Sequence, residues 1–166
     1  MGICPICQMS PLLPKLGKVS PCNCTATRKA SRRLSQMYDG ALVSSGLKST
    51  QYSIIAEIYR RGHEPLTVSE LAEAMVMHRS TLGHNLRPLE RDKLIALQST
   101  ESDRRTKRVV LTKKGRARFA EAYVLWRRAQ DRFEQRFGTK EAADLRAVLL
   151  SIAADSSLAY SASPPF

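Results

Sequence analysis

The sequence predicts a mainly α-helical protein that contains one small β-hairpin. Apolar residues recur at intervals of three and four over most of the chain, which is the spacing of one face of an α-helix. Two short runs with strand character, 94–98 and 108–112, flank a polar and basic segment at 102–107, as the strands of a hairpin flank its tip. With 166 residues, 43% of them hydrophobic, the chain is long enough to bury one core.

The first two helices are predicted at 25–42 and 51–59. The apolar face of the first helix is formed by Ala30, Leu34, Met37, Tyr38 and Ala41, and Gly40 weakens this helix near its end. In the second helix the pattern turns four residues inward, namely Tyr52, Ile55, Ile58 and Tyr59. Arg61-Gly62 closes the second helix.

Two further helices separated by a short turn are predicted at 67–75 and 79–91. Thr67 and Glu70 have capping-box spacing at the start of the first of them. In the second, Leu82, Leu86 and Leu89 form a buried stripe, and Pro88 predicts a bend or a tightened turn near the end. The polar residues that lie largely off the stripe are Ser80, Thr81, His84, Asn85 and Arg87. Such side chains suit base edges and phosphates, so this helix is predicted to contact DNA.

The predicted hairpin carries concentrated positive charge. Its tip and second strand contain Arg104, Arg105, Lys107 and Arg108, and the basic run continues through Lys113, Lys114, Arg116 and Arg118 with no acidic residue between Asp103 and Glu121. A basic hairpin by itself is often a solvated loop. Behind a helix-turn-helix, however, it is predicted to be a DNA-gripping wing, which gives a winged helix-turn-helix.

The C-terminal part is predicted to supply a dimer interface. A long helix carries Phe119, Tyr123, Trp126, Phe133 and Phe137 and stops at Gly138. Thr139 is expected to cap a final helix with an apolar stripe formed by Ala142, Leu145, Leu149 and Ile152. A stripe on a terminal helix needs a partner, and a two-fold DNA-binding protein is expected to be a homodimer.

Charge and motifs restrict the class of protein. The net charge of +12 and the pI of about 10.0 predict a polyanionic partner. No apolar run reaches the roughly 18 to 20 residues of a membrane span, and prolines interrupt the N-terminal apolar residues, so a cytoplasmic protein without membrane contact is expected. The sequence has no glycine-rich phosphate loop, nucleophile elbow or catalytic His/Asp/Glu cluster, so neither enzymatic activity nor a cofactor is predicted.

These segments resemble the MarR-type (multiple antibiotic resistance regulator) winged-helix transcription factors. The resemblance covers about residues 25–152 and rests on the segments 66–72, 79–91, 94–95, 103–105 and 111–115. It implies a homodimer whose recognition helix lies in the major groove of DNA while a wing arginine enters the neighbouring minor groove. By position, Arg105 would be that arginine and Asp103 would hold the wing tip in shape. His78 departs from the pattern, because close relatives often have an acidic residue at this helix start.

The predicted organisation follows from these elements. A cysteine-containing arm at 1–24 precedes a winged-helix domain at 25–155, and a flexible tail follows at 156–166. Within the domain, 49–115 is the DNA-binding core, and 25–45 and 116–155 are dimerisation helices. The expected function is a repressor that blocks a promoter until a signal at the dimerisation helices changes the separation of the two recognition helices. An architectural protein that binds DNA without regulation is the alternative.

All four cysteines lie in the first 24 residues, at Cys4, Cys7, Cys22 and Cys24, and three interpretations stay open. Cys-x-x-Cys followed by Cys-x-Cys could give zinc four thiolates, although Cys-x-Cys is an uncommon half-site. Alternatively, Cys24 at the start of the first helix, one turn before Arg28, has the environment of a reactive thiolate, which would make it a redox switch. The third interpretation is four thiols that stay reduced in the cytosol.

The resemblance also indicates which chemical signals the protein is expected to sense. Cys24, the Ala-Ser-Arg at 30–32 and Tyr38 are similar in spacing to the organic-hydroperoxide-sensing branch of the family, which implies Cys24 as the sensing thiol and Tyr38 as its hydrogen-bond partner. Ser49 replaces a further tyrosine of that branch and no C-terminal cysteine is present, so Cys22, Cys4 or Cys7 would resolve the oxidised thiol. The family also often has a ligand cavity beside the dimerisation helices. Core packing is the simpler role of the aromatic residues, but a cavity for an aromatic acid or its thioester would involve Tyr38, Tyr52, Tyr59 and Trp126.

Overall fold

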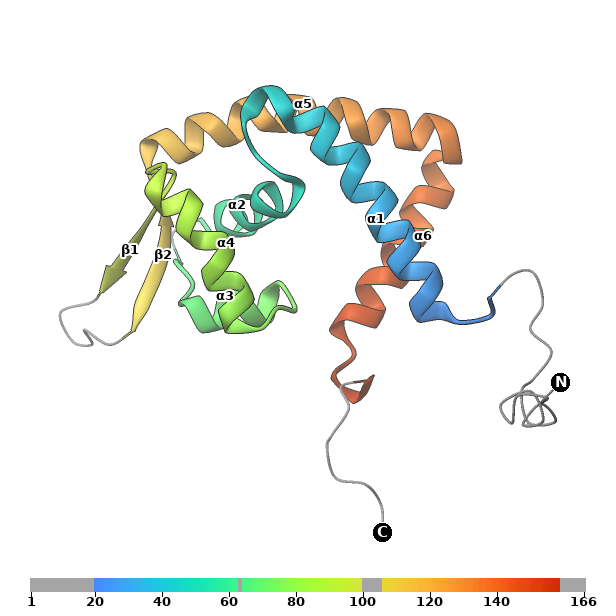
Figure 1. Cartoon of the computed structure of the whole chain (residues 1–166), viewed down its shortest axis with the longest axis horizontal. Helices are drawn as coiled ribbons and strands as arrows, with labels where there is room; N and C mark the ends of the chain where they lie inside the picture. Colours follow the sequence, from blue (N-terminus) through green and yellow to red (C-terminus); the bar gives the residue numbers. More distant parts are fainter. Residues whose placement is uncertain (1–19, 63, 100–105, 159–166) are drawn as a thin grey trace, which may run out of the picture. The chain divides into compact units, whose positions relative to one another are not determined.

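The computed structural model describes residues 20–62, 64–99 and 106–158. The chain divides into two compact units, one up to Ser35 and one from Gln36 onward. Helix α1 (Asn23–Leu42) is followed by a 3₁₀ turn (Val43–Ser45), α2 (Ser49–Arg60), α3 (Val68–Ala74) and α4 (Arg79–Arg91). Strands β1 (Ile95–Ser99) and β2 (Lys107–Leu111), α5 (Lys113–Phe137), α6 (Thr139–Ala154) and a 3₁₀ turn (Ser156–Leu158) complete the described elements (Figure 1).

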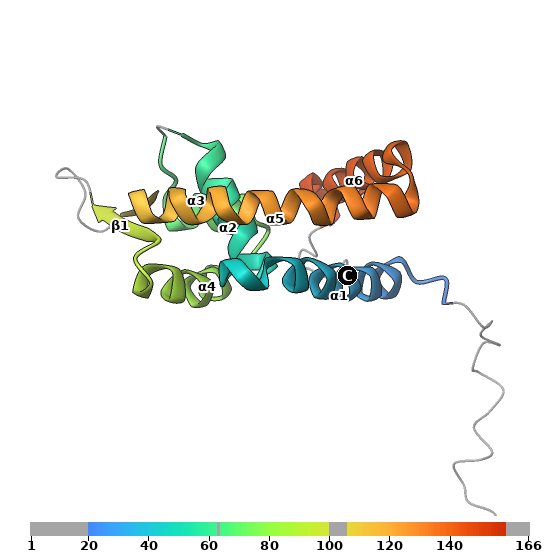
Figure 2. The ribbon, with the colours of Figure 1, turned by 90° about the horizontal axis from the view of Figure 1, so that it is seen from above.

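The mainly helical fold with one hairpin is therefore as predicted. β1 and β2 pair antiparallel, with Ile95 opposite Leu111 and Ser99 opposite Lys107. In the second unit, α5 leads from the hairpin at one end to α6 at the other, and α2, α3 and α4 lie on one side of its first half (Figures 1 and 2). No helix in the described ranges combines the length and the apolar character that crossing a membrane requires.

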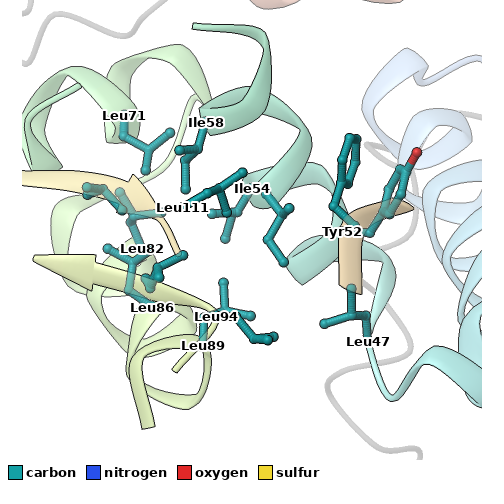
Figure 3. Packing of buried hydrophobic residues seen from close by; sticks show 14 of the residues in the cluster. Leu47, Tyr52, Ile54, Ile58, Leu71, Leu82, Leu86, Leu89, Leu94 and Leu111 are labelled. Atoms are coloured by element: carbon teal, nitrogen blue, oxygen red, sulfur yellow. The ribbon is translucent and has the colours of Figure 1, made fainter. Parts of the chain in front are cut away.

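The core lies between α2, α3, α4, the hairpin and the start of α5. Ile54 and Ile58 of α2 pack with the leucine stripe of α4 and with Leu111 of β2 (Figure 3). Leu82 and Leu89 are exposed by no more than 1% of their surface, as the helical spacing of the sequence predicts. Burying a leucine side chain contributes roughly 1.5–3 kcal/mol, so this stripe fixes which face of α4 remains at the surface.

Two expectations about the helices are wrong. Tyr59 was expected to face inward, but 55% of its surface is exposed, and Ile54 takes the buried position instead. Thr139 was expected to cap the last helix, but Gly138 is the N-cap residue, with φ of +96°, and Thr139 is the first helical residue. Gly138 is both the C-cap of α5 and the N-cap of α6, so no loop separates the two helices, and its φ of +96° is one that residues with a side chain rarely adopt.

The start of α5 is joined closely to the end of α4. The Thr112 hydroxyl donates to the Lys93 carbonyl at 2.7 Å and accepts from the Gly115 N–H at 2.9 Å, so it caps α5 and ties it to the segment before β1. A Cβ atom on Gly115 would lie 1.9 Å from the Leu94 carbonyl oxygen. Only a residue without a side chain allows this approach, which sets where the hairpin meets α5.

Candidate nucleic-acid interface

The capping box predicted from Thr67 and Glu70 is present at the start of α3. The Thr67 hydroxyl accepts from the Glu70 N–H at 3.1 Å, and the Glu70 carboxylate accepts from the Thr67 N–H at 2.8 Å. The bond from the Thr67 backbone N–H to the carboxylate, with a smaller contribution from the Thr67 side chain, lowers the pKa of Glu70. Because Leu71 and Ala72 anchor α3 in the core, the capped helix holds the turn that leads into α4 in one place.

Helix α4 presents a polar face to solvent. Ser80, Thr81, His84 and Arg87 are exposed, while the leucine stripe on the opposite side is buried. Asn85 is half-buried, and its side-chain amide donates to the Thr81 carbonyl at 2.9 Å. The helix continues through Pro88 to Arg91, and its N-cap residue His78 makes no side-chain capping bond. The exposed donors and acceptors are of the kinds that bind bases and phosphates in a groove.

One further exposed residue of α4, Arg79, was not among the predicted DNA contacts. Arg79 is the first residue of α4 and is exposed beside Ser80 and Thr81. The N-terminal turn of a recognition helix is the part that approaches base edges, and arginine is the commonest side chain that contacts guanine. Its position immediately after the turn was the signal that could have identified it.

The hairpin next to α4 holds its basic residues in two ways. Lys107 is exposed, and its ammonium group donates to the Ser99 hydroxyl across the strands at 2.9 Å. The guanidinium of Arg108 is partly buried and donates to the Pro65 carbonyl at 2.7 Å. Arg108 thus joins β2 to the segment before α3, and its predicted contact with DNA stays a prediction. Asp103, Arg104 and Arg105 lie outside the described residues.

Helices α3 and α4, the hairpin that follows and its docking on α5 together define a winged helix-turn-helix fold. A sequence profile of the MarR family matches residues 45–106. The transcriptional regulator MosR of M. tuberculosis, solved in complex with DNA, is 38% identical, and the alignment covers 80% of this chain and 93% of that chain with a TM-score of 0.71. The chain therefore belongs to the MarR family.

A second solved structure supports this assignment. The transcriptional repressor CouR of Rhodococcus jostii RHA1, bound to a 23-mer DNA duplex, is 26% identical. The alignment covers 85% of this chain and 99% of that chain, with a TM-score of 0.74. Among curated proteins, none matches the chain.

Cys24 is the second residue of α1, at the helix start as predicted, and Cys22 immediately precedes the helix. The Cys22 carbonyl accepts from the Ala26 N–H at 3.0 Å, and its sulfur accepts from the Thr25 N–H at 3.5 Å. Hydrogen bonds from Thr25 lower the pKa of the Cys22 thiol. Cys22 and Cys24 are both exposed, free thiols, whereas Cys4 and Cys7 lie outside the described residues. Within the described ranges, no group of three or more His, Cys, Asp or Glu residues could hold a metal ion.

An aromatic cavity of about 1040 Å³ lies between α2, the end of α3, α5 and α6. Its aromatic lining consists of Tyr52, Tyr59, Phe119, Tyr123 and Trp126. The rings of Tyr52 and Trp126 stack with centroids 5.8 Å apart, and burial raises the pKa of Tyr52 to about 12. We refer to this site as the aromatic cavity.

Tyr38 lies outside this aromatic lining. Its hydroxyl donates to Oε1 of the buried Gln130 at 2.6 Å, and the Gln130 side-chain nitrogen donates to Glu134 at 2.8 Å. Burial raises the pKa of Tyr38. Tyr38 therefore has a hydrogen-bond partner on α5, and its role beside Cys24 stays a prediction.

Proposed function

We propose that the protein is a homodimeric, sequence-specific DNA-binding repressor of transcription. The observation that carries this proposal is the exposed polar face of α4, which the α3 capping box and the buried leucine stripe hold at the surface beside a basic hairpin. In this proposal, α4 enters the major groove and the hairpin reaches the adjacent minor groove. MosR and CouR, the two relatives compared above, were both solved with DNA.

The recognition surface is tested by fluorescence anisotropy with a duplex from upstream of the protein's own gene and a scrambled duplex. Thr81→Ala and His84→Ala should each weaken binding to the upstream duplex by about 1–3 kcal/mol if they contact bases, with little effect on scrambled DNA. Arg87→Ala should weaken binding to both duplexes and lower the slope of log K against log salt by about 0.9 if it contacts a phosphate.

Arg128→Ala is the matched control, because it removes an exposed arginine from the second half of α5. Equal losses for Arg87→Ala and Arg128→Ala on every duplex would show that net charge, and not the face of α4, determines binding. Equal affinity of the wild-type protein for both duplexes would instead favour an architectural DNA-binding protein.

The dimer would form through the exposed apolar residues of α6. Leu145, Val148, Leu149 and Ile152 are each between 37% and 57% exposed in the single chain. Four neighbouring apolar side chains left in water on one helix are typical of a surface that a partner covers. Leu149→Glu should therefore produce a monomer in analytical ultracentrifugation, whereas Lys140→Glu, at an exposed polar position of the same helix, should leave the dimer intact. A dimer that persists in Leu149→Glu would contradict this interface.

We propose reversible oxidation of the Cys22–Cys24 pair as the signal that releases DNA. Exposed thiols at a helix start, one of them with a lowered pKa, favour attack on a hydroperoxide. The thiolate would take the terminal oxygen of an organic hydroperoxide, giving a sulfenic acid and an alcohol. The second thiol would then displace water to form a disulfide. The resemblance assigns the first step to Cys24, whereas the hydrogen bonds from Thr25 favour Cys22.

Single cysteine variants distinguish whether Cys22 or Cys24 is oxidised first. Oxidation of Cys24→Ser and of Cys22→Ser with one equivalent of an organic hydroperoxide, followed by dimedone labelling, should mark the attacked sulfur in the variant that retains it. DNA binding should be lost on oxidation of the wild-type protein, restored by dithiothreitol, and unaffected by oxidation in the double variant. Oxidation-sensitive binding in the double variant would exclude this pair.

The second candidate signal is a small ligand in the aromatic cavity. The stacked rings of Tyr52 and Trp126, exposed to a cavity of about 1040 Å³, favour a planar aromatic acid or its thioester. Such a ligand should change the emission of Trp126, the single tryptophan of the chain, and weaken DNA binding in the Cys22/Cys24 double variant as well. Ligand binding that leaves DNA affinity unchanged would remove this candidate.

A further inference from the structure

A second cavity, separate from the aromatic one, lies behind the hairpin. It has a volume of about 570 Å³ and lies between the end of α2, the segment before α3, the hairpin and the first turn of α5. Its apolar walls are aliphatic and consist of Ile58, Pro65, Val109, Val110 and Leu111. The polar side chains on it are Tyr59, Gln98 and Arg116. We call this site the hairpin cavity.

The walls of the hairpin cavity are held in place by contacts between distant segments. The Arg108 guanidinium donates to the Pro65 carbonyl at 2.7 Å, and the Val109 N–H donates to the Leu66 carbonyl at 2.8 Å. On the other side, the Tyr59 ring packs on Phe119 with centroids 4.8 Å apart. The cavity is therefore formed before any ligand arrives, which lowers the entropic cost of binding.

Arg116 gives this cavity an uncompensated positive charge. Within the described ranges, the Arg116 guanidinium forms no ion pair or hydrogen bond, and the residues described as lining the cavity include no carboxylate. Neighbouring arginines differ, because Arg118 pairs with Glu121 at 3.4 Å, and Arg60 and Arg61 both pair with Glu57. An unpaired guanidinium at the edge of an apolar cavity favours an anion, and its planar fork matches a carboxylate in particular.

We propose that the hairpin cavity binds a small aliphatic carboxylate, with the carboxylate on Arg116 and the hydrocarbon chain against the half-buried side chains of Val110 and Pro65. The aliphatic walls distinguish this site from the aromatic cavity, where stacked rings favour a planar ligand. Tyr59 and Arg116 line both cavities.

A ligand here would contact the hairpin, α2 and α5 together. If the protein binds DNA as proposed above, on which this consequence rests, the bound ligand would shift the position of the hairpin relative to DNA. The binding test below contains no DNA, so failure of the carboxylate site and failure of the DNA-binding proposal give separate results.

The test is a titration of protein labelled with ¹³C in its Ile, Leu and Val methyl groups with octanoate, and with octanamide as the neutral analogue. Octanoate should shift the methyl signals of Ile58, Val110 and Leu111 saturably, and octanamide should bind at least about tenfold more weakly. Arg116→Gln should weaken octanoate binding by about tenfold or more, and Arg128→Gln, an exposed arginine on the same helix, should bind within about twofold of the wild-type protein.

A second variant keeps the proposal open to refutation if Arg116→Gln is unstable. Val110→Phe retains Arg116 but fills part of the cavity, and it should also abolish the octanoate shifts. The proposal fails if about 10 mM octanoate gives no saturable shifts, or if a folded Arg116→Gln binds as well as the wild-type protein. It also fails if the shifts fall on Val76 and Leu150, which line the aromatic cavity, with a change in Trp126 emission.

Discussion

Replacement of Gly115 by alanine should cost more stability than any other glycine-to-alanine change at a described helical position. A Cβ there would lie 1.9 Å from the Leu94 carbonyl oxygen and 2.9 Å from its carbonyl carbon, about 1.5 Å short of ordinary contact. Both of these atoms belong to the backbone, so no side chain can move aside. The Leu94 carbonyl also accepts from the Thr112 N–H at 3.1 Å, and retreat of the carbonyl breaks this bond.

The magnitude follows from these contacts. Overpacking at a rigid site costs about 1–3 kcal/mol, and the lost hydrogen bond costs about 1 kcal/mol. Gly115→Ala should therefore lower the free energy of unfolding by about 2–4 kcal/mol, which is a large part of the 5–15 kcal/mol typical of a folded domain.

Gly83→Ala is the matched control. Gly83 lies within α4, and a Cβ there would meet nothing within 4 Å. Alanine at this helical position should raise stability by about 0.5–1 kcal/mol, because it restricts the unfolded chain and favours the helix. The two changes add the same methyl group with opposite expected signs.

The assay is urea unfolding followed by far-UV circular dichroism, with all variants at one protein concentration because the stability of a dimer depends on it. If Gly115→Ala unfolds within about 0.5 kcal/mol of the wild-type protein, the close approach of α5 to Leu94 is not maintained in solution. The reasoning then fails, whatever the result for Gly83→Ala.

Four further measurements address individual side chains. Thr67→Ala should cost about 1 kcal/mol in urea unfolding, because the Glu70 N–H loses its capping acceptor. The pKa of Glu70 is lowered in the folded protein, so its contribution to the free energy of unfolding is present above the usual glutamate pKa and is lost as the pH falls through the lowered pKa. Glu70→Gln should therefore make the free energy of unfolding less dependent on pH in the acid range. Tyr38→Phe should cost about 1 kcal/mol, and less when Gln130 is already leucine, because the hydrogen bond between them is then absent. The pKa of Tyr52 is raised to about 12, so Tyr52 should ionise after the other tyrosines in an ultraviolet pH titration. Its contribution to the free energy of unfolding should be complete below about pH 10 and should be lost as the pH rises towards 12. If the absorbance change near pH 12 is the same in Tyr52→Phe, this prediction is contradicted.

Much of the DNA-binding surface could be predicted because its signals are local. The spacing of Thr67 and Glu70 specifies a helix start, and the leucine stripe of α4 specifies which face is buried and hence which polar residues are exposed. The two strands are separated by a short basic segment, and the observed strands differ from the predicted ones by one residue. Each of these patterns acts over fewer than about ten residues, where backbone geometry and side-chain periodicity determine the outcome.

Only the tertiary structure could assign the side chains whose partners are distant in the sequence. Arg108 bonds to a carbonyl 43 residues away, and Tyr38 to an amide 92 residues away, so neither role is visible in the local pattern. Arg116 belongs to a long basic run in the sequence, and its place in the lining of two cavities separates it from the other members of that run.

The sequence by itself determined the class of fold, the position of the recognition helix and the resemblance to the MarR family. The tertiary structure decided which basic residues remain available to a ligand, where Tyr59 faces, and that the Cys22 sulfur accepts from the Thr25 N–H. The physical reason is that helices and hairpins are specified by short-range spacing, whereas cavities and side-chain partners depend on how the elements pack.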